Sequence, residues 1–323
     1  MKKLLKIIGL DIIFIAVVAV GFVWAAGPYP NRPITMVVWS TSGMGDTVTR
    51  VLCMNAEKTL GQPIIIETKP GAAGAIAISY VAQSKPDGYT LGMAVTSNYT
   101  INPHLRKLSY DTLTSITDLL AVCKYNFGLA VRADLPWKTY EDIIAYARKN
   151  PEKFTYACAG IGVTQHICME RIAMKEGIKW TAVPFKSGGE AVLACLGGHT
   201  DAVIQGSVDQ VPHIKSGKLR MLLSLDGSRW PDVPNAPTIT EKGYNFTAMS
   251  YISYLGPRGI SEPIRQKLEN AFKKAMESAS YTGVMKQFNV QSTFMSGKEY
   301  SALWRSQYDE MGRIVKILGL TEN

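Results

Sequence analysis

The chain is short of the features that assign many proteins to a class at once. Five cysteines in 323 residues, none in a C-x-x-C pair, exclude a thioredoxin-type redox site and a zinc ribbon. Charged residues make up 19% and hydrophobic residues 46%, which excludes an intrinsically disordered chain. Only one apolar run approaches membrane length, and it lies at the N-terminus, so a polytopic membrane protein is excluded.

Local catalytic and cofactor motifs are also missing. The sequence has no P-loop, no H-E-x-x-H and no G-x-S-x-G. Gly43-Met44-Gly45 follows a predicted strand, but Val48 stands where a dinucleotide fingerprint needs its third glycine. The four histidines are dispersed, and the basic residues behind the net charge of +9 are scattered. We therefore expect no cofactor, no metal site, no catalytic residue and no nucleic-acid partner; a secreted hydrolase is kept only as an alternative class.

The N-terminus has the layout of an export signal. Three lysines within the first six residues precede an uninterrupted apolar run, Ile12 to Trp24. Val23-Trp24-Ala25 offers a cleavage site, which predicts a signal peptide over residues 1–25 and a periplasmic protein with a charge of +7. An uncleaved anchor is the alternative. The first cysteine is Cys53, so a lipoprotein anchor is excluded.

The odd number of cysteines leaves at least one thiol free in an exported protein. Cys158 and Cys168 are close enough in sequence to pair. We favour the alternative that the cysteines are buried as small hydrophobic residues.

Strand, loop and helix patterns alternate along the chain, which is typical of an α/β fold with parallel sheets. The first unit is predicted to contain strands and helices at 33–39, 46–60, 64–67, 74–84 and 89–95. A second unit follows, with predicted elements at 128–131, 139–150, 154–157, 164 onward, 180–185, 188–196, 201–205 and 219–225.

Two helices are predicted to close the chain after a proline-rich stretch. Ser261 is the expected N-cap of the first, and Ser296 with Glu299 forms a capping box for the second. An apolar stripe from Tyr300 to Leu318 along the second helix predicts a buried face.

Two loops are suited to hold a small anion. Ser40–Asp46 and Ala157–His166 each combine glycine and hydroxyl residues between a strand and a helix start. Backbone N–H groups at a helix start favour a carboxylate or phosphate. The alternative is that both are plain connections with ordinary caps. If the first loop is a plain connection, Asp46 is a cap or first-turn residue. If the loop binds a ligand, Asp46 faces the cleft and selects a ligand amine. His166 is expected to orient the second loop.

The order of short motifs along the chain resembles the substrate-binding proteins of tripartite tricarboxylate transporters, the Bug-type family. The resemblance rests on residues 29–34, 69–74, 86–91, 109–111, 156–166, 183–186, 196–199, 217–220, 231–234 and 238–241.

The resemblance implies a two-lobe periplasmic binding protein of type II, each lobe a mainly parallel sheet flanked by helices, with the ligand cleft between them. It implies a discontinuous first lobe, 26–123 plus 226–323, and a second lobe, 124–225. The ligand-binding residues implied by the loops and the cleft edge are Ser40, Thr41, Ser42, Gly43, Met44, Asp46, Thr96, Ser97, Ala159, Gly160, Gly162, Thr164, His166, Gln205 and Ser207.

The resemblance also implies a function. A monomeric periplasmic receptor would capture a small organic carboxylate by lobe closure and deliver it, unchanged, to a large and a small membrane subunit of the transporter. The alternative is a carboxylate sensor that acts with a signalling partner. Departures from the family pattern lie in the ligand loops: Trp39-Ser40 replaces a proline-aromatic pair, the first loop is about one residue short, and Cys158 and Ala159 stand where serine is common.

Overall fold

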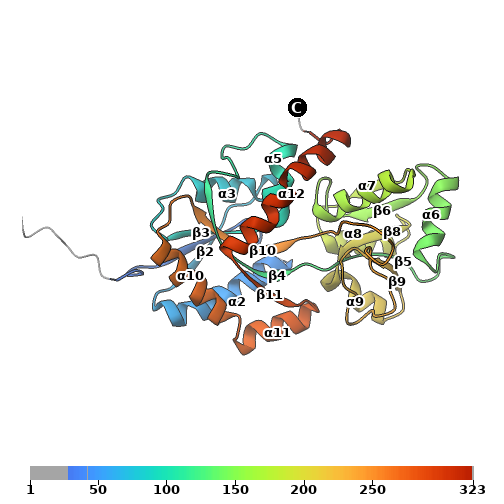
Figure 1. Ribbon diagram of the computed structural model, residues 1–323. Helices are drawn as coiled ribbons and strands as arrows, with labels where there is room; N and C mark the ends of the chain where they lie inside the picture. Colours follow the sequence, from blue (N-terminus) through green and yellow to red (C-terminus); the bar gives the residue numbers. More distant parts are fainter. Residues whose placement is uncertain (1–27, 42, 322–323) are drawn as a thin grey trace, which may run out of the picture.

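A computed structural model describes residues 28–41 and 43–321 and shows two lobes, each a mixed β-sheet flanked by helices (Figure 1). The predicted signal peptide, 1–25, and the candidate ligand residue Ser42 lie outside the described residues. Among the helices of the described part, none combines the length and the apolar character needed to cross a membrane.

The first lobe is built on a six-stranded sheet with the order β11-β4-β10-β3-β1-β2. Strands β1 to β4 run in one direction, and β10 and β11 run against them. The strand bounds are β1 Ile34–Val38, β2 Ile64–Thr68, β3 Thr90–Val95, β4 Ile116–Lys124, β10 Tyr251–Pro257 and β11 Ser292–Ser296. The sheet therefore joins an early and a late part of the chain.

Helices cover both faces of this sheet, each over its own apolar core. One face carries α2 (Gly43–Leu60), α10 (Glu262–Ala275) and α11 (Ala279–Phe288). The other carries η1 (Ala72–Gly74), α3 (Ala75–Ala82), α4 (Thr96–Thr100), α5 (Asn102–Leu105) and α12 (Gly297–Ile317). Because α12 buries Tyr300, Trp304 and Val315, its apolar stripe is core, as predicted.

The second lobe has a five-stranded sheet with the order β7-β6-β8-β5-β9, in which β5 alone runs against the rest. Its strands are β5 Phe127–Arg132, β6 Thr155–Cys158, β7 Thr181–Pro184, β8 Ala202–Gly206 and β9 Leu219–Ser224. Its helices are α6 Tyr140–Lys149 and α7 Thr164–Glu176 on one core, and α8 Gly188–Leu196 and α9 Ser207–Lys215 on the other.

The chain crosses between the lobes twice, and the two crossovers lie side by side. The first passes from β4 through Tyr125 to β5, and the second runs from β9 to β10. The N–H of Tyr125 donates to the Ser250 carbonyl at 2.8 Å. At the same place Lys124 Nζ lies 2.9 Å from Oδ1 of the fully buried Asp226. These contacts join the two crossovers in a compact connection, which we call the hinge, and the lobe boundaries at 123/124 and 225/226 stay a prediction.

Most local signals in the sequence are confirmed, with some corrections. Thr139 accepts from the Asp142 N–H, and Ser296 forms its capping box with Glu299. Ser261 is the N-cap of α10, as predicted, and its side chain makes no capping hydrogen bond. Three helices, not two, close the chain, since α11 lies between the two predicted ones. All five cysteines are buried and unpaired, as favoured.

Candidate functional site

The first predicted ligand loop follows β1 and runs directly into α2. Met44 and Asp46 are buried in the first turn of this helix. Arg50 Nε donates to both Asp46 oxygens, at 3.0 and 2.9 Å. The Asp46 carboxylate is therefore held by an ion pair within its own helix.

Tyr125, in the first crossover, brings the hinge against this loop. A Cβ at Gly45 would lie 3.3 Å from the Tyr125 hydroxyl oxygen, so the close approach depends on a glycine. The Tyr125 ring stacks on Phe127 with centroids 5.6 Å apart, and it packs on the cores of both lobes. The first loop thus borders the lobe boundary at the hinge.

The second predicted loop follows β6 and touches the opposite lobe through a glycine. Gly160 and Gly162 have φ angles of 109° and 78°, which L side chains rarely adopt. A Cβ at Gly162 would lie 2.5 Å from Leu105 of α5, in the first lobe. The loop is closed by the Gly162 N–H, which donates to Nδ1 of His166 at 3.3 Å. Burial lowers the pKa of His166 to about 4, so the ring is neutral and able to accept this bond.

The helix that this loop opens, α7, starts without a side-chain cap. Its N-cap is Val163, whose side chain has no hydrogen-bond acceptor, and its first turn has no acidic residue. By contrast α6, α8, α11 and α12 are capped by a threonine or serine hydroxyl. Among the described residues no side chain accepts from the first three N–H groups of α7. These groups are left with partial positive charge at the lobe boundary.

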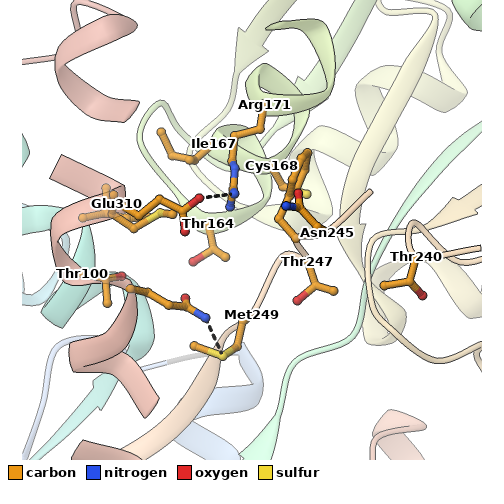
Figure 2. A pocket seen from close by; sticks show the side chains of 14 residues that line it. Thr100, Thr164, Ile167, Cys168, Arg171, Thr240, Asn245, Thr247, Met249 and Glu310 are labelled. Atoms are coloured by element: carbon orange, nitrogen blue, oxygen red, sulfur yellow. Dashed lines mark hydrogen bonds and ion pairs between the residues drawn. The ribbon is translucent and has the colours of Figure 1, made fainter. Parts of the chain in front are cut away.

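A cavity of about 310 Å³ lies between the lobes beside α7 (Figure 2). It is lined by residues of α7, α4, α12 and the second crossover, and Thr164 is the predicted site residue among them. Arg171 Nη2 lies 2.6 Å from Glu310 Oε1 across the boundary, and the Arg171 guanidinium stacks 3.9 Å above the Phe246 ring.

Sequence reasoning missed the other polar residues of this cavity. They are Thr100, Arg171, Thr240, Asn245, Thr247, Gln307 and Glu310. Thr164, Ile167, Cys168 and Arg171 are spaced i, i+3, i+4 and i+7, so one face of α7 could have been singled out. Nothing in the local pattern says that this face meets α12.

The other candidate residues have different surroundings. The Thr96 hydroxyl accepts from the Tyr251 N–H at 2.8 Å and bonds the Tyr300 hydroxyl at 3.1 Å, so it holds α4 to the core. The Ser207 hydroxyl donates to the Phe288 carbonyl of the first lobe at 3.1 Å. Gln205 is buried, and its Oε1 accepts from the Gly206 N–H at 3.1 Å. Ser97 and Ala159 are half-buried, and Thr41 is exposed.

Metal binding has no donor set in the part of the chain that the structure describes. Within those residues no three side chains of histidine, cysteine, aspartate or glutamate gather closely enough to hold an ion.

Comparison with known proteins gives a family match over most of the chain. Residues 48–320 match the model of the tripartite tricarboxylate transporter family receptor. A UPF0065 protein from the gbd 5' region of Cupriavidus necator is 35% identical over 92% of this chain and 90% of its own. Protein BugT of Bordetella pertussis is 30% identical over 86% of each chain.

Solved structures agree with this match. MatC from Rhodopseudomonas palustris with bound malate is 27% identical, with a TM-score of 0.75 over 89% of this chain and 100% of its own. Rpa4515 of R. palustris with adipate is 26% identical, with a TM-score of 0.78 over 90% and 98%. The two-lobe fold is shared with solute-binding proteins.

Proposed function

The chain belongs to the tripartite tricarboxylate transporter receptor family, and from that premise we propose that it captures a small organic carboxylate and delivers it to membrane transporter subunits. Receptors of this family are periplasmic, which supports the predicted export of this chain. Two structures similar to it hold malate and adipate, both small dicarboxylates. The ligand of this chain is accordingly expected to carry at least one carboxylate.

The observation that carries the proposal is the uncapped start of α7 beside a cavity between the lobes. A ligand carboxylate placed there accepts from backbone N–H groups that have no other side-chain acceptor in the described part of the chain. Hydrogen bonds to a charged group contribute about 1.5–3 kcal/mol each. The glycines of the second loop allow a ligand to approach the backbone closely. We propose that the first loop, at the start of α2, contacts the ligand from the first lobe.

Lobe closure is the proposed mechanism of capture. The two loops belong to different lobes, and the crossovers at Tyr125 and Ser250 are the segments about which the lobes rotate. We take residues 26–123 plus 226–323 as one moving body and 124–225 as the other. Closure removes water from the carboxylate, which strengthens its hydrogen bonds.

We propose that the ligand leaves unchanged. The family and the similar structures are solute-binding receptors. His166, the titratable side chain of the second loop, is kept neutral by burial and accepts from Gly162. Its role is to shape the loop rather than to exchange protons with a ligand.

Calorimetry on the purified protein tests the proposal with malate, adipate, succinate and citrate as ligands. We expect saturable binding of at least one acid with one site per chain. Native mass spectrometry of freshly purified protein should show a bound acid that dialysis against a competing carboxylate removes. Absence of binding to every acid, together with absence of a co-purified acid, would overturn the proposal. A strain that lacks the membrane subunits should lose uptake of the acid.

A further inference from the structure

An acidic side chain that the sequence analysis did not single out lies where the second lobe meets the hinge. Asp209 is the third residue of α9, directly after β8. A Cβ built on Gly188, the first residue of α8, would lie 2.6 Å from Asp209 Oδ2. The same point lies 3.0 Å from Nε2 of Gln205. The carboxylate and the amide therefore both pack against this glycine, whose lack of a side chain allows their close approach.

The usual structural role for an acid at this position is already taken by another residue. The third residue of a helix commonly accepts from the N-cap N–H. Here that N–H belongs to Gly206, and it donates to Gln205 Oε1 at 3.1 Å. Among the described residues neither a hydrogen bond nor an ion pair reaches the Asp209 carboxylate.

Gln205 gives a second, independent indication of a ligand. The residue is 4% exposed, and its Nε2 finds no hydrogen-bond acceptor among the described residues. A buried donor without a partner costs more than an ordinary hydrogen bond gains, so such groups are rare unless something else binds them. A carboxylate oxygen of a ligand is an acceptor of the right kind.

The pair faces the lobe boundary. A Cβ on Gly206, which ends β8, would lie 3.8 Å from the Asn126 carbonyl oxygen in the first crossover and 4.0 Å from Asp209 Oδ2, so Asp209 is close to that crossover. The Tyr125 hydroxyl lies beside Gly45 of the first ligand loop. Two residues before Asp209, the Ser207 hydroxyl donates to the first-lobe carbonyl of Phe288.

We propose that Gln205 and Asp209 form a subsite for an amino carboxylate, in which the amide binds a ligand carboxylate oxygen and Asp209 binds a protonated amine. The inference rests on the proposed function and narrows its substrate class. A second ligand carboxylate at this position would be repelled by Asp209, whereas an ammonium group is attracted. Asp46, the acid that the sequence offered for this role, is already paired with Arg50.

The test compares acids that differ only in the amine. Calorimetry is done with succinate against aspartate and with glutarate against glutamate. The wild-type protein is expected to bind the amino form of at least one pair ten times more tightly or better. N-acetylaspartate, which keeps both carboxylates and loses the amine charge, should bind at least tenfold more weakly than aspartate; this comparison needs no variant.

Asp209→Asn should reduce the preference for the amino form at least tenfold, with unchanged or tighter binding of the plain diacid. Asp134→Asn is the control, because Asp134 is 72% exposed on the surface and paired with Arg132. It should leave both affinities unchanged, and circular dichroism checks the fold of each variant. Equal or tighter binding of the plain diacids by the wild type overturns this inference and leaves the proposed function standing. Failure of every acid to bind, with none co-purified, overturns both.

Discussion

Gly162 is the residue at which the second ligand loop fits against the opposite lobe. Its φ of 78° disfavours any side chain, and an added Cβ would lie 2.5 Å from Leu105 Cδ1, so one of the two must shift. We expect Gly162→Ala to lose about 1–2 kcal/mol of stability from the left-handed backbone. Because the loop must also move away from Leu105, carboxylate affinity should fall tenfold or more in calorimetry.

Gly177→Ala is the matched control for this change. Gly177 follows α7 with a φ of 64°, and a Cβ there would have nothing within 4 Å. The backbone cost is the same, but the affinity should stay at the wild-type value. Equal losses of affinity in the two variants would show that the contact between Gly162 and Leu105 does not contribute to carboxylate binding.

His166 makes stability depend on pH in a predictable direction. Burial lowers its pKa from 6.5 to about 4. Between these values His166 is protonated in the unfolded chain but stays neutral in the folded protein. The free energy of unfolding therefore decreases as the pH falls from about 6.5 to 4. At pH 5 the loss is about 2 kcal/mol.

Urea unfolding of wild type and His166→Gln at pH 7.5 and pH 5 checks this prediction. Groups common to both proteins cancel in the comparison, so the variant should lose about 2 kcal/mol less on acidification. An identical loss in the two proteins would mean that the folded protein protonates His166 as readily as the unfolded chain.

At the scale of the element, α7 ties the ligand loop to α12 through one ion pair. Arg171 is mostly buried and lies 2.6 Å from Glu310, whose side chain is 44% exposed. Because Glu310 is solvated, we expect Glu310→Gln to cost about 1 kcal/mol or less. Because the pair joins the two lobes, carboxylate affinity should fall up to about fivefold in calorimetry.

The control is Glu152→Gln, which removes an exposed pair with Lys179 inside the second lobe. Its N–O distance is 3.6 Å, and it touches neither α12 nor the cavity. Affinity should be unchanged. A loss equal to that of Glu310→Gln would assign the effect to surface charge rather than to contact between the lobes.

Elements whose ends are marked by local capping residues could be predicted from the sequence, and elements stabilised by residues distant in the chain could not. The box of Thr139 with Asp142 marks α6 because its hydrogen bonds are local. Strand β4 contains the buried Asp118, whose Oδ2 accepts from Trp304 Nε1 at 3.0 Å. Strand β10 contains Ser253, bonded to Tyr99. These polar residues interrupt the apolar pattern, and only the fold supplies their partners.

The candidate site divides in the same way. Both glycine-containing loops were predicted because a strand, a turn and a helix start are adjacent in sequence. The importance of Arg171 and Asp209 depends on what each side chain meets across the lobe boundary. Arg171 meets a residue 139 positions later in the chain, and no local spacing encodes that contact.

At the scale of the whole molecule, the hinge depends on a buried ion pair between Lys124 and Asp226. The Asp226 side chain is fully buried and also accepts from the Phe127 N–H. Asp226→Asn leaves a mostly buried lysine without its counter-charge, and we expect a loss of about 3 kcal/mol in urea unfolding. The control Asp232→Asn breaks a pair of similar length, 2.8 Å, with the 59% exposed Lys215. It should cost less than about 1 kcal/mol.

Closure of the lobes is the movement on which the proposed function depends. The two crossovers lie side by side, joined by the backbone bond from Tyr125 to Ser250 and by the ion pair of Lys124 with Asp226, and we propose that the lobes rotate about them. Saturating the protein with a bound carboxylate should therefore lower the radius of gyration in small-angle X-ray scattering. Gly162→Ala, at ligand concentrations that give the same occupancy, should show a smaller decrease because its loop cannot seat against Leu105. An unchanged radius at full occupancy would mean that the ligand enters lobes already closed, and the division of the chain into two moving bodies would then have no support.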